Sequence, residues 1–245
     1  MKTWIINLKK DAERRAHMAQ ICKKYDLDYE FVDAVYGKAL TDTQIEDQFD
    51  RTLSYKRYGR VLNLGEIGCT LSHYKCYQNL LKSNEPYVLI LEDDITIVGE
   101  MSVLPQCANL LNSEDPIILF LSGDYWWYRK KNVNGVCVTN VFDAVGAYAY
   151  LINRAAARLI IKLNTPPSCV ADHWSLYRAQ GIELKAIFPY VIDANIESFS
   201  STIKQETFGE NRTKMPIKML IPAYWNALVK KILLRLGCFV SKIRK

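Results

Sequence analysis

The sequence predicts an α/β protein with a Rossmann-type, mostly parallel sheet flanked by helices. Two continuous apolar runs, residues 86–91 and 117–121, are typical of strands that are buried on both faces of a parallel sheet. Segments with apolar residues at helical spacing alternate with such runs along the chain, as in α/β folds. The length of 245 residues and the 49% hydrophobic content fit one large domain, or one domain with an appendage.

The first part of the chain resembles a βαβ unit followed by a long packed helix. Short apolar runs predict its strands, and apolar residues that recur with a period near 3.6 predict its helices. The predicted elements are a strand at 4–8, a helix at 11–22, a strand at 29–34, a polar helix from Thr41 toward Asp50, a basic tyrosine-rich loop at 55–60 and a helix at 64–81.

The second part continues the alternation of strands and helices. Asn153 is a suitable N-cap for one of its helices, because an Asn side chain can accept a bond from the free backbone N–H groups of a first turn. The predicted elements are strands at 86–91 and 117–121, extended segments at 136–142 and 146–152, a strand at 184–188, and helices at 100–111, 153–163 and 172–180. Ligands of such a sheet bind beyond the carboxyl ends of its strands.

The charge distribution divides the chain into a folded domain at 1–210 and a basic amphipathic tail at 211–245. The tail contains nine Lys and Arg residues and no acid, so the remainder carries a net charge of −3 within a total of +6. The tail's basic residues are Arg212, Lys214, Lys218, Lys230, Lys231, Arg235, Lys242, Arg244 and Lys245. Positive charge is not spread over the domain, which argues against a nucleic-acid partner.

The tail predicts an interfacial helix in which Pro222 takes a first helical position. An apolar stripe from Tyr224 to Ile243 faces a basic side, which suits an anionic lipid surface at the inner leaflet. The charges are too frequent for a membrane span. The alternative is that the apolar stripe packs on the protein's own domain.

The start of the chain and its seven cysteines predict a cytoplasmic protein. The apolar stretch at 4–8 is too short for a signal peptide, and the cysteines are odd in number and lack a CxxC pair. They are expected to be reduced thiols. His17, His73 and His173 are widely separated, so the sequence does not predict a zinc site.

Glu92, Asp93 and Asp94 are the strongest chemical signal, because three acids directly after a buried strand repel one another unless a cation or hydrogen-bond donors neutralise them. Oxygen ligands favour Mg²⁺ or Mn²⁺. Side chains 92 and 94 share one face of an extended strand, so at most two of the acids reach one ion easily. The alternative is a solvated turn. Asp124 follows the next buried strand in the same way.

A second signal is the glycine-rich helix start at Gly65–Gly68, which is followed on the same helix by Ser72 and His73. Glycines there allow a backbone or a phosphate to approach closely. The alternative is a helix packed tightly through Gly68, with His73 as a hydrogen-bonded core residue.

Together these motifs resemble glycosyltransferase family 25, which includes bacterial lipooligosaccharide β-galactosyltransferases and collagen galactosyltransferases. The resemblance spans about residues 3–203. It is carried, in order, by Ile6-Asn7-Leu8 with Asp11, Arg14 and Arg15; Gly65-Glu66-Ile67-Gly68-Cys69 with Leu71-Ser72-His73; Leu91-Glu92-Asp93-Asp94; Gly146–Ile152 leading into Ala155 and Ala156; and Asp172. The acids read Glu-Asp-Asp, unlike the spaced Asp-x-Asp of many related enzymes.

The resemblance implies a GT-A fold and an inverting transfer of galactose or glucose from UDP-galactose or UDP-glucose. It implies Mn²⁺, or Mg²⁺, held by the acidic motif, and a lipid-linked saccharide acceptor of the lipooligosaccharide or lipopolysaccharide type. With the tail, it predicts a peripheral enzyme on the inner face of the cytoplasmic membrane. Two other functions are compatible with parts of the sequence: a sugar-phosphate nucleotidyltransferase, which would need a glycine-rich basic loop after the first strand, and a non-catalytic membrane adaptor.

The resemblance, together with the chemistry of this transfer, implies roles for individual residues. A departing diphosphate needs a metal and a cationic side chain, and the acceptor hydroxyl needs a carboxylate base. The predicted roles are Asp93 and Asp94 as metal ligands, Glu92 at the ribose, Asn7 and Leu8 at the uracil, Arg14 or Arg15 at the diphosphate, Ser72 and His73 in the donor site, and Asp172, or else Asp124, as the base. The alternatives are a surface charge for the arginines and a helix N-cap for Asp172. Trp126, Trp127 and Tyr128 are predicted either to stack on a sugar or to pack in the core.

Overall fold

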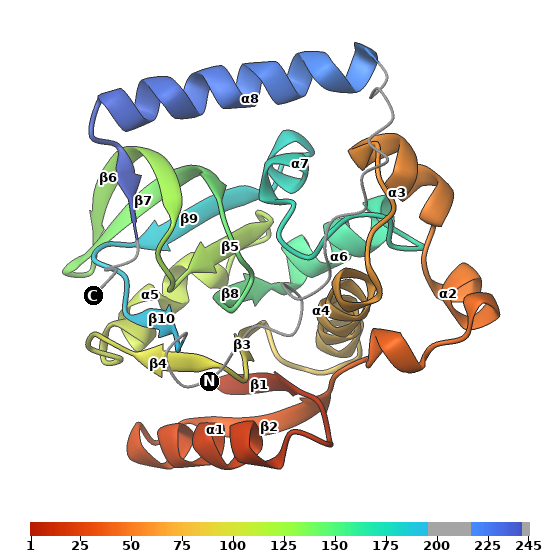
Figure 1. Cartoon of the computed structure of the whole chain (residues 1–245). Coiled ribbons are helices and arrows are strands. Elements are labelled where there is room, and N and C mark those ends of the chain that lie inside the picture. The colour runs from red at the N-terminus through yellow and green to blue at the C-terminus, as the bar shows by residue number, and fades with distance from the viewer. Residues whose placement is uncertain (196–216, 242–245) are drawn as a thin grey trace.

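A computed structural model of the chain describes residues 1–195 and 217–241. Its centre is a nine-stranded sheet with the strand order β11-β6-β7-β9-β5-β8-β3-β1-β2, and a second sheet pairs β10 with β4 (Figure 1). The strands are β1 (Lys2–Asn7), β2 (Asp28–Asp33), β3 (Tyr87–Glu92), β4 (Ile95–Ile97), β5 (Ile117–Phe120), β6 (Tyr125–Val133), β7 (Val136–Ala144), β8 (Ala149–Asn153), β9 (Glu183–Ile187), β10 (Ile192–Ala194) and β11 (Phe239–Val240). The predicted α/β class is confirmed.

Most strands of the large sheet run in the same direction, but neighbouring strands form both parallel and antiparallel pairs. β2, β1 and β3 are parallel neighbours, and so are β5 and β9. β8 lies between β3 and β5 and is antiparallel to both. At the other end, β7 is antiparallel to β9 and to β6, and β11 is antiparallel to β6. Thus β1, β2, β3, β5, β6 and β9 run in one direction, and their carboxyl ends meet at one edge.

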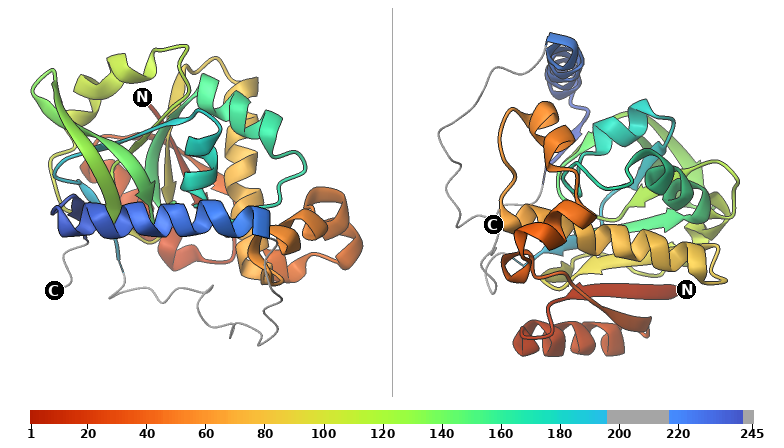
Figure 2. Two further views of the ribbon diagram at one scale, coloured as in Figure 1. Left: turned by 90° about the horizontal axis from the view of Figure 1, so that it is seen from above. Right: turned by 90° about the vertical axis from the view of Figure 1, so that its right-hand side faces the viewer.

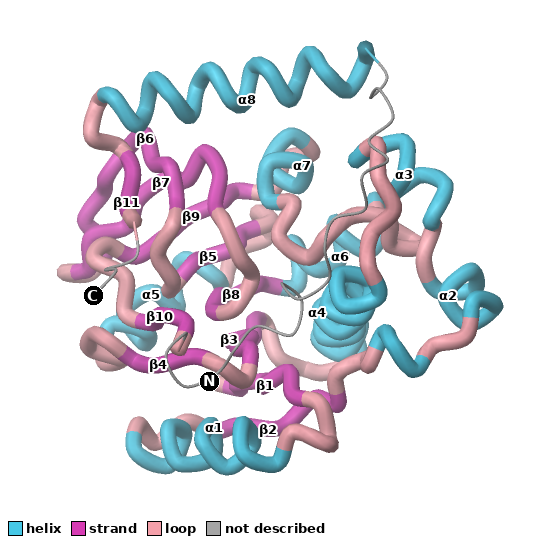
Figure 3. Tube along the Cα trace, in the orientation of Figure 1, coloured by secondary structure: helices cyan, strands magenta, loops and turns pink. Residues whose placement is uncertain are grey.

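Helices cover both faces of the sheet (Figure 3). On one face α1 (Ala12–Lys24) and α5 (Val103–Leu111) pack on side chains such as Leu89 and Leu119. On the other, α4 (Leu64–Lys82), α6 (Arg154–Leu163) and α7 (Trp174–Ala179) pack on Ile90, Ile118 and Phe120. Alternate strand residues therefore fill two separate cores, which explains why β3 and β5 are continuous apolar runs.

The loops before α4 are more helical than the sequence predicts. They contain η1 (Gly37–Ala39), α2 (Asp42–Gln48) and α3 (Arg51–Tyr58). The predicted loop at 55–60 was wrong, because the Asp50 carboxylate accepts the N–H of Leu53 at 2.7 Å and so starts a helix. That helix ends at Gly59, whose φ of 62° is left-handed. The predicted cap at Asn153 is confirmed by its 2.9 Å bond from Ala156 N–H.

The C-terminal helix α8 (Ile217–Arg235) crosses over β6 and β7 (Figures 1 and 2). Pro222 lies inside α8 and not at its first position, which corrects the prediction. Within the described residues, none of the helices combines the length and the apolar content that a membrane span needs. The predicted domain boundary at 210/211 lies outside the described residues, as do Arg212, Lys214, Lys242, Ile243, Arg244 and Lys245.

α8 is attached to the sheet through a few contacts and exposes most of its apolar side chains. Leu233 is buried, and the Lys230 ammonium forms an ion pair with the buried Asp143 carboxylate and lies 4.3 Å from the centre of a Trp126 ring. Lys230 therefore faces the domain. The exposed apolar residues of α8 include Ile221, Tyr224, Trp225, Leu228 and Ile232.

Candidate active site

An open pocket of about 210 Å³ lies beyond the carboxyl ends of β1 and β3. Its walls come from the segment after β1, from the segment after β2 and from one face of α4. Its lining includes Leu8, Arg14, Val35, Tyr36, Gly65, Cys69, Ser72, His73, Glu92 and Asp93. The predicted edge of the sheet is thus where the structure forms a pocket. Among the described residues, its lining does not include Asn7, Arg15, Asp94, Asp124 or Asp172.

Asp93 is held by residues of β1 and α1. Its Oδ1 accepts a bond from Arg14 Nη1 at 2.7 Å, and its Oδ2 accepts one from Asn7 Nδ2 at 2.8 Å. Burial raises the pKa of Asp93, and the bonds from Arg14 and Asn7 oppose this rise. Both carboxylate oxygens are therefore already engaged within the protein, which fits a structural ion pair better than the metal ligand predicted from the sequence.

Asp94 has fewer such contacts. Arg14 Nη1 lies 3.4 Å from Asp94 Oδ2, a distance at the long end for an ion pair with a hydrogen bond. Burial, together with the negative charge of Glu92, raises the pKa of Asp94 to about 6. Glu92 and Asp94 therefore form a pair of acids that repel each other at the edge of β3, which is the arrangement that a cation would relieve.

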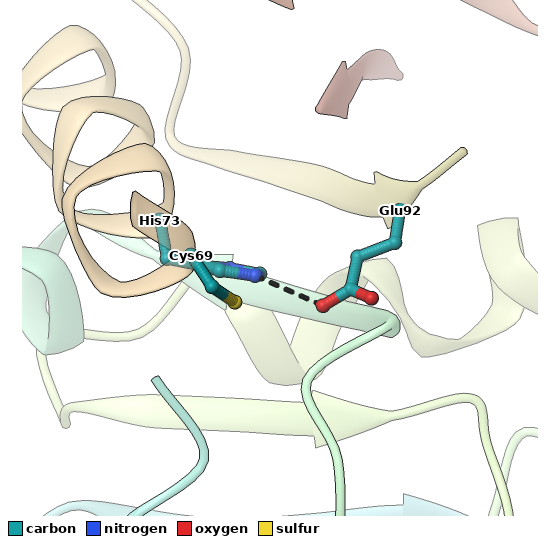
Figure 4. Close-up of side chains that lie close together, drawn as sticks. All are labelled: Cys69, His73 and Glu92. Carbon is teal, nitrogen blue, oxygen red and sulfur yellow. Dashed lines mark hydrogen bonds and ion pairs between the residues drawn. The ribbon is translucent and has the colours of Figure 1, made fainter. Parts of the chain in front are cut away.

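His73 connects Glu92 to the protein interior. Its Nε2 lies 3.2 Å from Glu92 Oε1, and its Nδ1 lies 2.8 Å from the Tyr150 hydroxyl (Figure 4 shows His73 and Glu92). The Tyr150 hydroxyl in turn lies 2.8 Å from that of Tyr77. His73, Tyr77 and Tyr150 are all buried. This chain of hydrogen bonds fixes the imidazole with one nitrogen directed at Glu92.

Ser72 and the glycines of α4 have structural roles. The Ser72 hydroxyl donates to Gly68 O at 2.6 Å and accepts from Val35 N–H at 2.8 Å. A Cβ atom at Gly68 would lie 2.6 Å from Val35 O, and one at Gly37 would lie 1.7 Å from Leu64 O. The predicted close approach at Gly68 is therefore real, and the group that approaches is the segment after β2, which forms a wall of the pocket.

The Asp172 side chain bonds to the segment that precedes β8. Its Oδ2 accepts the N–H of Gly146 at 3.0 Å, and Trp174 Nε1 donates to Gly146 O at 2.9 Å. The N-cap residue of α7 is His173, so the alternative that Asp172 caps this helix was wrong. Burial raises the pKa of Asp172, and the charges of Glu92 and Asp143 raise it further.

The remaining predicted residues are dispersed. Arg15 donates to Asn7 Oδ1 at 3.3 Å and lies 4.0 Å from the Phe31 ring centre, so it supports β1 and β2. Asp124 has a left-handed φ of 63°, and its carbonyl accepts Val145 N–H at 2.9 Å. Trp126 packs on Phe239 with ring centres 4.7 Å apart, which supports the packing alternative for this residue.

Comparison with known proteins identifies the family. The model of the family described as "Glycosyltransferase family 25 (LPS biosynthesis protein)" matches residues 1–175. The chain belongs to glycosyltransferase family 25. The match covers all of the pocket residues named above, and it confirms the resemblance that the sequence motifs indicate.

Two sequence relatives support the same assignment. Over 97 residues the chain is 38% identical to procollagen galactosyltransferase 1-A of Xenopus laevis, which is 38% of this chain and only 16% of that protein. Over 175 residues it is 26% identical to a putative glycosyltransferase of Haemophilus influenzae, covering 69% of this chain and 60% of the relative. A solved galactosyltransferase LgtC with donor and acceptor sugar analogs aligns over 67% of this chain and 63% of its own, at 13% identity and a TM-score of 0.35.

The sequence patterns do not identify two residues that lie beside His73 in the structure, Cys69 and Tyr150. Cys69 was noted only as part of a motif, although it precedes His73 by four residues and so shares its helix face. Tyr150 lies in a buried strand, and nothing in its spacing indicates a bond to a histidine 77 positions away. Helical spacing could have placed Cys69 beside His73. The contact of Tyr150 with His73 depends on the pairing of β8 with β3.

Proposed function

We propose that this family 25 chain is an inverting, metal-dependent glycosyltransferase that moves galactose, or glucose, from a UDP-sugar to the saccharide of a lipooligosaccharide or lipopolysaccharide acceptor. The observation that supports it most is the acidic pair Glu92 and Asp94, of which Glu92 lines an open pocket together with the cationic Arg14. The family's description as an LPS biosynthesis family agrees with this class of acceptor.

For the metal we retain Asp94 and replace Asp93 by Glu92. Glu92 ends β3 and Asp94 follows it in the turn before β4, and their mutual repulsion suits a divalent cation. Carboxylate oxygens favour Mn²⁺ or Mg²⁺. When bound there, such an ion neutralises charge on the diphosphate leaving group. Asp93 then keeps Arg14 in place.

The donor occupies the pocket. Its apolar side, with Leu8, Ala34 and Val35, suits the uracil base. Lys10 and Lys38 also line the pocket and add positive charge for the diphosphate. Asn7 acts on the donor indirectly, by holding Asp93. The assignment of Leu8 to the uracil follows the prediction from the sequence.

Asp172 is the proposed base. In the reaction its carboxylate takes the proton of the acceptor hydroxyl while the acceptor oxygen bonds to the anomeric carbon. The bond from that carbon to the diphosphate oxygen breaks, and UDP leaves with the electron pair. Attack from the face opposite the leaving group inverts the anomeric centre. The bond from Gly146 orients one oxygen of Asp172, and its raised pKa makes it a stronger base than an ordinary aspartate.

The acceptor is proposed to be lipid-linked, with the enzyme bound to the inner face of the cytoplasmic membrane. α8 supports this proposal, since it exposes Tyr224, Trp225 and Leu228 together with basic residues such as Lys231. Aromatic and aliphatic side chains with nearby cations bind anionic lipid surfaces.

The test is to incubate the purified protein with a panel of nucleotide sugars and Mn²⁺ and to measure UDP release with and without a saccharide acceptor. We expect release from UDP-galactose, or from UDP-glucose, that depends on the metal. Release of pyrophosphate from a sugar phosphate and a nucleoside triphosphate would instead indicate a nucleotidyltransferase. No release from any sugar, together with tight lipid binding, would indicate an adaptor.

A further inference from the structure

Three potential metal ligands from two elements meet at the wall of the pocket. Cys69 and His73 lie one turn apart on α4, and Glu92 ends β3. The thiol sulfur, an imidazole nitrogen and a carboxylate oxygen all lie within 4.8 Å of one another. In Figure 4 the side chains of Cys69 and His73 project from the same helix toward Glu92. Bonds of about 2.0–2.3 Å to a single ion would need only small movements of these side chains.

The chemistry of this set differs from that of the acidic pair. A thiolate and an imidazole with one carboxylate favour Zn²⁺, whereas Mn²⁺ and Mg²⁺ prefer oxygen ligands. Three protein ligands leave a fourth tetrahedral position open. Because Cys69, His73 and Glu92 all line the pocket, that position faces the space in which the donor is proposed to bind.

The surroundings of His73 suit a metal ligand. Histidines that bind metals usually donate their other ring N–H to a fixed acceptor. With Nε2 on the ion, Nδ1 carries the proton and donates to the Tyr150 hydroxyl at 2.8 Å, and Tyr150 donates to the Tyr77 hydroxyl at 2.8 Å. The chain of hydrogen bonds therefore stays complete when the proton of His73 moves from Nε2 to Nδ1.

The local field also favours a cation. The negative charges of Glu92, Asp172 and Asp94 act on Cys69, and they attract a divalent ion to the same place. A thiol becomes a thiolate when it binds a metal. Binding therefore releases the Cys69 proton to solvent, one per ion.

We propose that Cys69, His73 and Glu92 form a zinc site at the wall of the pocket and that zinc bound there excludes the nucleotide-sugar donor. Zinc would engage Glu92, which the donor's metal also needs, and its fourth ligand would extend into the pocket. The exclusion of the donor rests on the proposed function, whereas the binding of zinc does not.

The binding test uses the full chain without nucleotide and Co²⁺ as a spectroscopic substitute for Zn²⁺. We expect one equivalent of Co²⁺ to give a thiolate-to-metal charge-transfer absorption that Zn²⁺ displaces. Cys69→Ser should lose this absorption, while Cys137→Ser, which removes a half-buried thiol on β7, should keep it. Tyr150→Phe should weaken zinc binding about 10- to 100-fold. Absorption that persists in Cys69→Ser, or none in the wild-type protein, would overturn the site.

Two measurements do not depend on the folding of the cysteine variant. In wild-type protein, the heat of zinc binding in buffers of different ionisation enthalpy should report one released proton per ion, and no release would contradict a thiolate ligand. His73→Gln should weaken zinc binding at least as much as Tyr150→Phe. A zinc affinity unchanged by His73→Gln would also overturn the proposal.

Exclusion of the donor is tested separately, with UDP binding measured at fixed Mn²⁺. We expect one equivalent of Zn²⁺ to weaken UDP binding in the wild-type protein and in Cys137→Ser but not in Cys69→Ser. If Zn²⁺ binds without weakening UDP binding, bound zinc does not exclude the donor, and only the zinc site itself stands. If no nucleotide sugar is turned over at all, the proposed function fails, and the cobalt spectrum still decides the zinc site.

Discussion

Arg14 on α1 and Asp93 after β3 form a largely buried ion pair at 2.7 Å, and the same guanidinium lies 3.4 Å from Asp94. The two neighbouring acids thus differ in their contacts: Asp93 accepts short bonds from Arg14 and Asn7, whereas Asp94 lies farther from the guanidinium. The pair joins the first helix of the fold to the edge of the third strand.

The first prediction is that removal of Arg14 destabilises the fold. Arg14→Met leaves Asp93 buried without its cation, and the loss of one partner of a buried pair costs about 3–5 kcal/mol in the free energy of unfolding. The Arg14 and Asp93 side chains are 16% and 10% exposed, so solvent screens them little. Urea denaturation measures the change. Arg51→Met is the control, because its partner Asp42 is 84% exposed and such a pair contributes about 0–1 kcal/mol. Equal effects of the two variants would contradict the role of Arg14.

The second prediction separates Asp94 from Asp93. Asp94→Asn should abolish metal-dependent UDP release without lowering stability, because the change is nearly isosteric and removes a charge that the fold disfavours. Asp93→Asn should lower stability, since it removes the charge that Arg14 faces. UDP release and thermal denaturation of both variants provide the measurement. Metal-dependent release that survives in Asp94→Asn would assign the metal to another group.

The third prediction concerns the base. Asp172→Asn should lower the transfer rate by about 10²–10⁴, the usual contribution of a general base, with UDP affinity nearly unchanged. Asp124→Asn is the matched control and should keep activity. If Asp124→Asn is inactive and Asp172→Asn is active, the base is Asp124.

A fourth prediction follows from the raised pKa of Asp172. A base acts when it is deprotonated, so kcat/KM should rise with pH through the pKa of Asp172. Because burial raises this pKa, the rise should occur above the ordinary aspartate value of 3.8. An acid limb centred at or below 3.8 would exclude Asp172 as the group that titrates.

The fifth prediction concerns stability and pH. The pKa of Asp94 is about 6 in the folded protein and near 3.8 as an ordinary value. The folded state therefore holds the Asp94 proton more tightly than the unfolded state does. As pH rises from about 4 to about 6 this proton is lost, and the free energy of unfolding should fall. In Asp94→Asn this part of the decline should be absent. Urea denaturation at several pH values, without divalent metal, measures it, and identical pH profiles would contradict the assignment.

The last prediction tests membrane association without removing the tail. Trp225→Gln with Leu228→Gln changes two exposed side chains of α8, so the contacts of Leu233 and Lys230 with the domain stay intact. We expect this double variant to lose sedimentation with anionic vesicles and to keep UDP release in solution. A double variant that sediments as well as the wild type would mean that α8 does not bind lipid.

Part of this structure could be predicted from local sequence. The strands β3 and β5 are evident because both of their faces are buried. The role of Asn153 as an N-cap is evident because a cap acts within three residues. The strand β6 was missed, since its exposed stretch contains Arg129, Lys130 and Lys131 and lacks an alternating pattern. The polar helix predicted from Thr41 is α2, whereas the segment that forms α3 was predicted to contain a loop at 55–60.

The roles of the acids could be predicted less well than their location. Their position after a buried strand indicates a site, but Asp93 and Asp94 differ through Asn7 and Arg14, and Arg14 lies 79 and 80 residues away from them. Likewise, Asp172 resembles a helix cap in sequence, and its bond to Gly146 arises from the packing of α7 beside β7. Contacts between distant segments decide these roles.

The pairing of β11 with β6 also affects how the molecule avoids self-association. β11 covers only Tyr125 and Trp126 of β6, so within the described residues the rest of this outer strand has no strand beside it on that side. Unpaired strand edges attract other chains, and lysines and arginines along an edge oppose this. The exposed cations at 129–131 lie on that open stretch. A short C-terminal strand and a run of like charges together keep one margin of the sheet from recruiting a second copy.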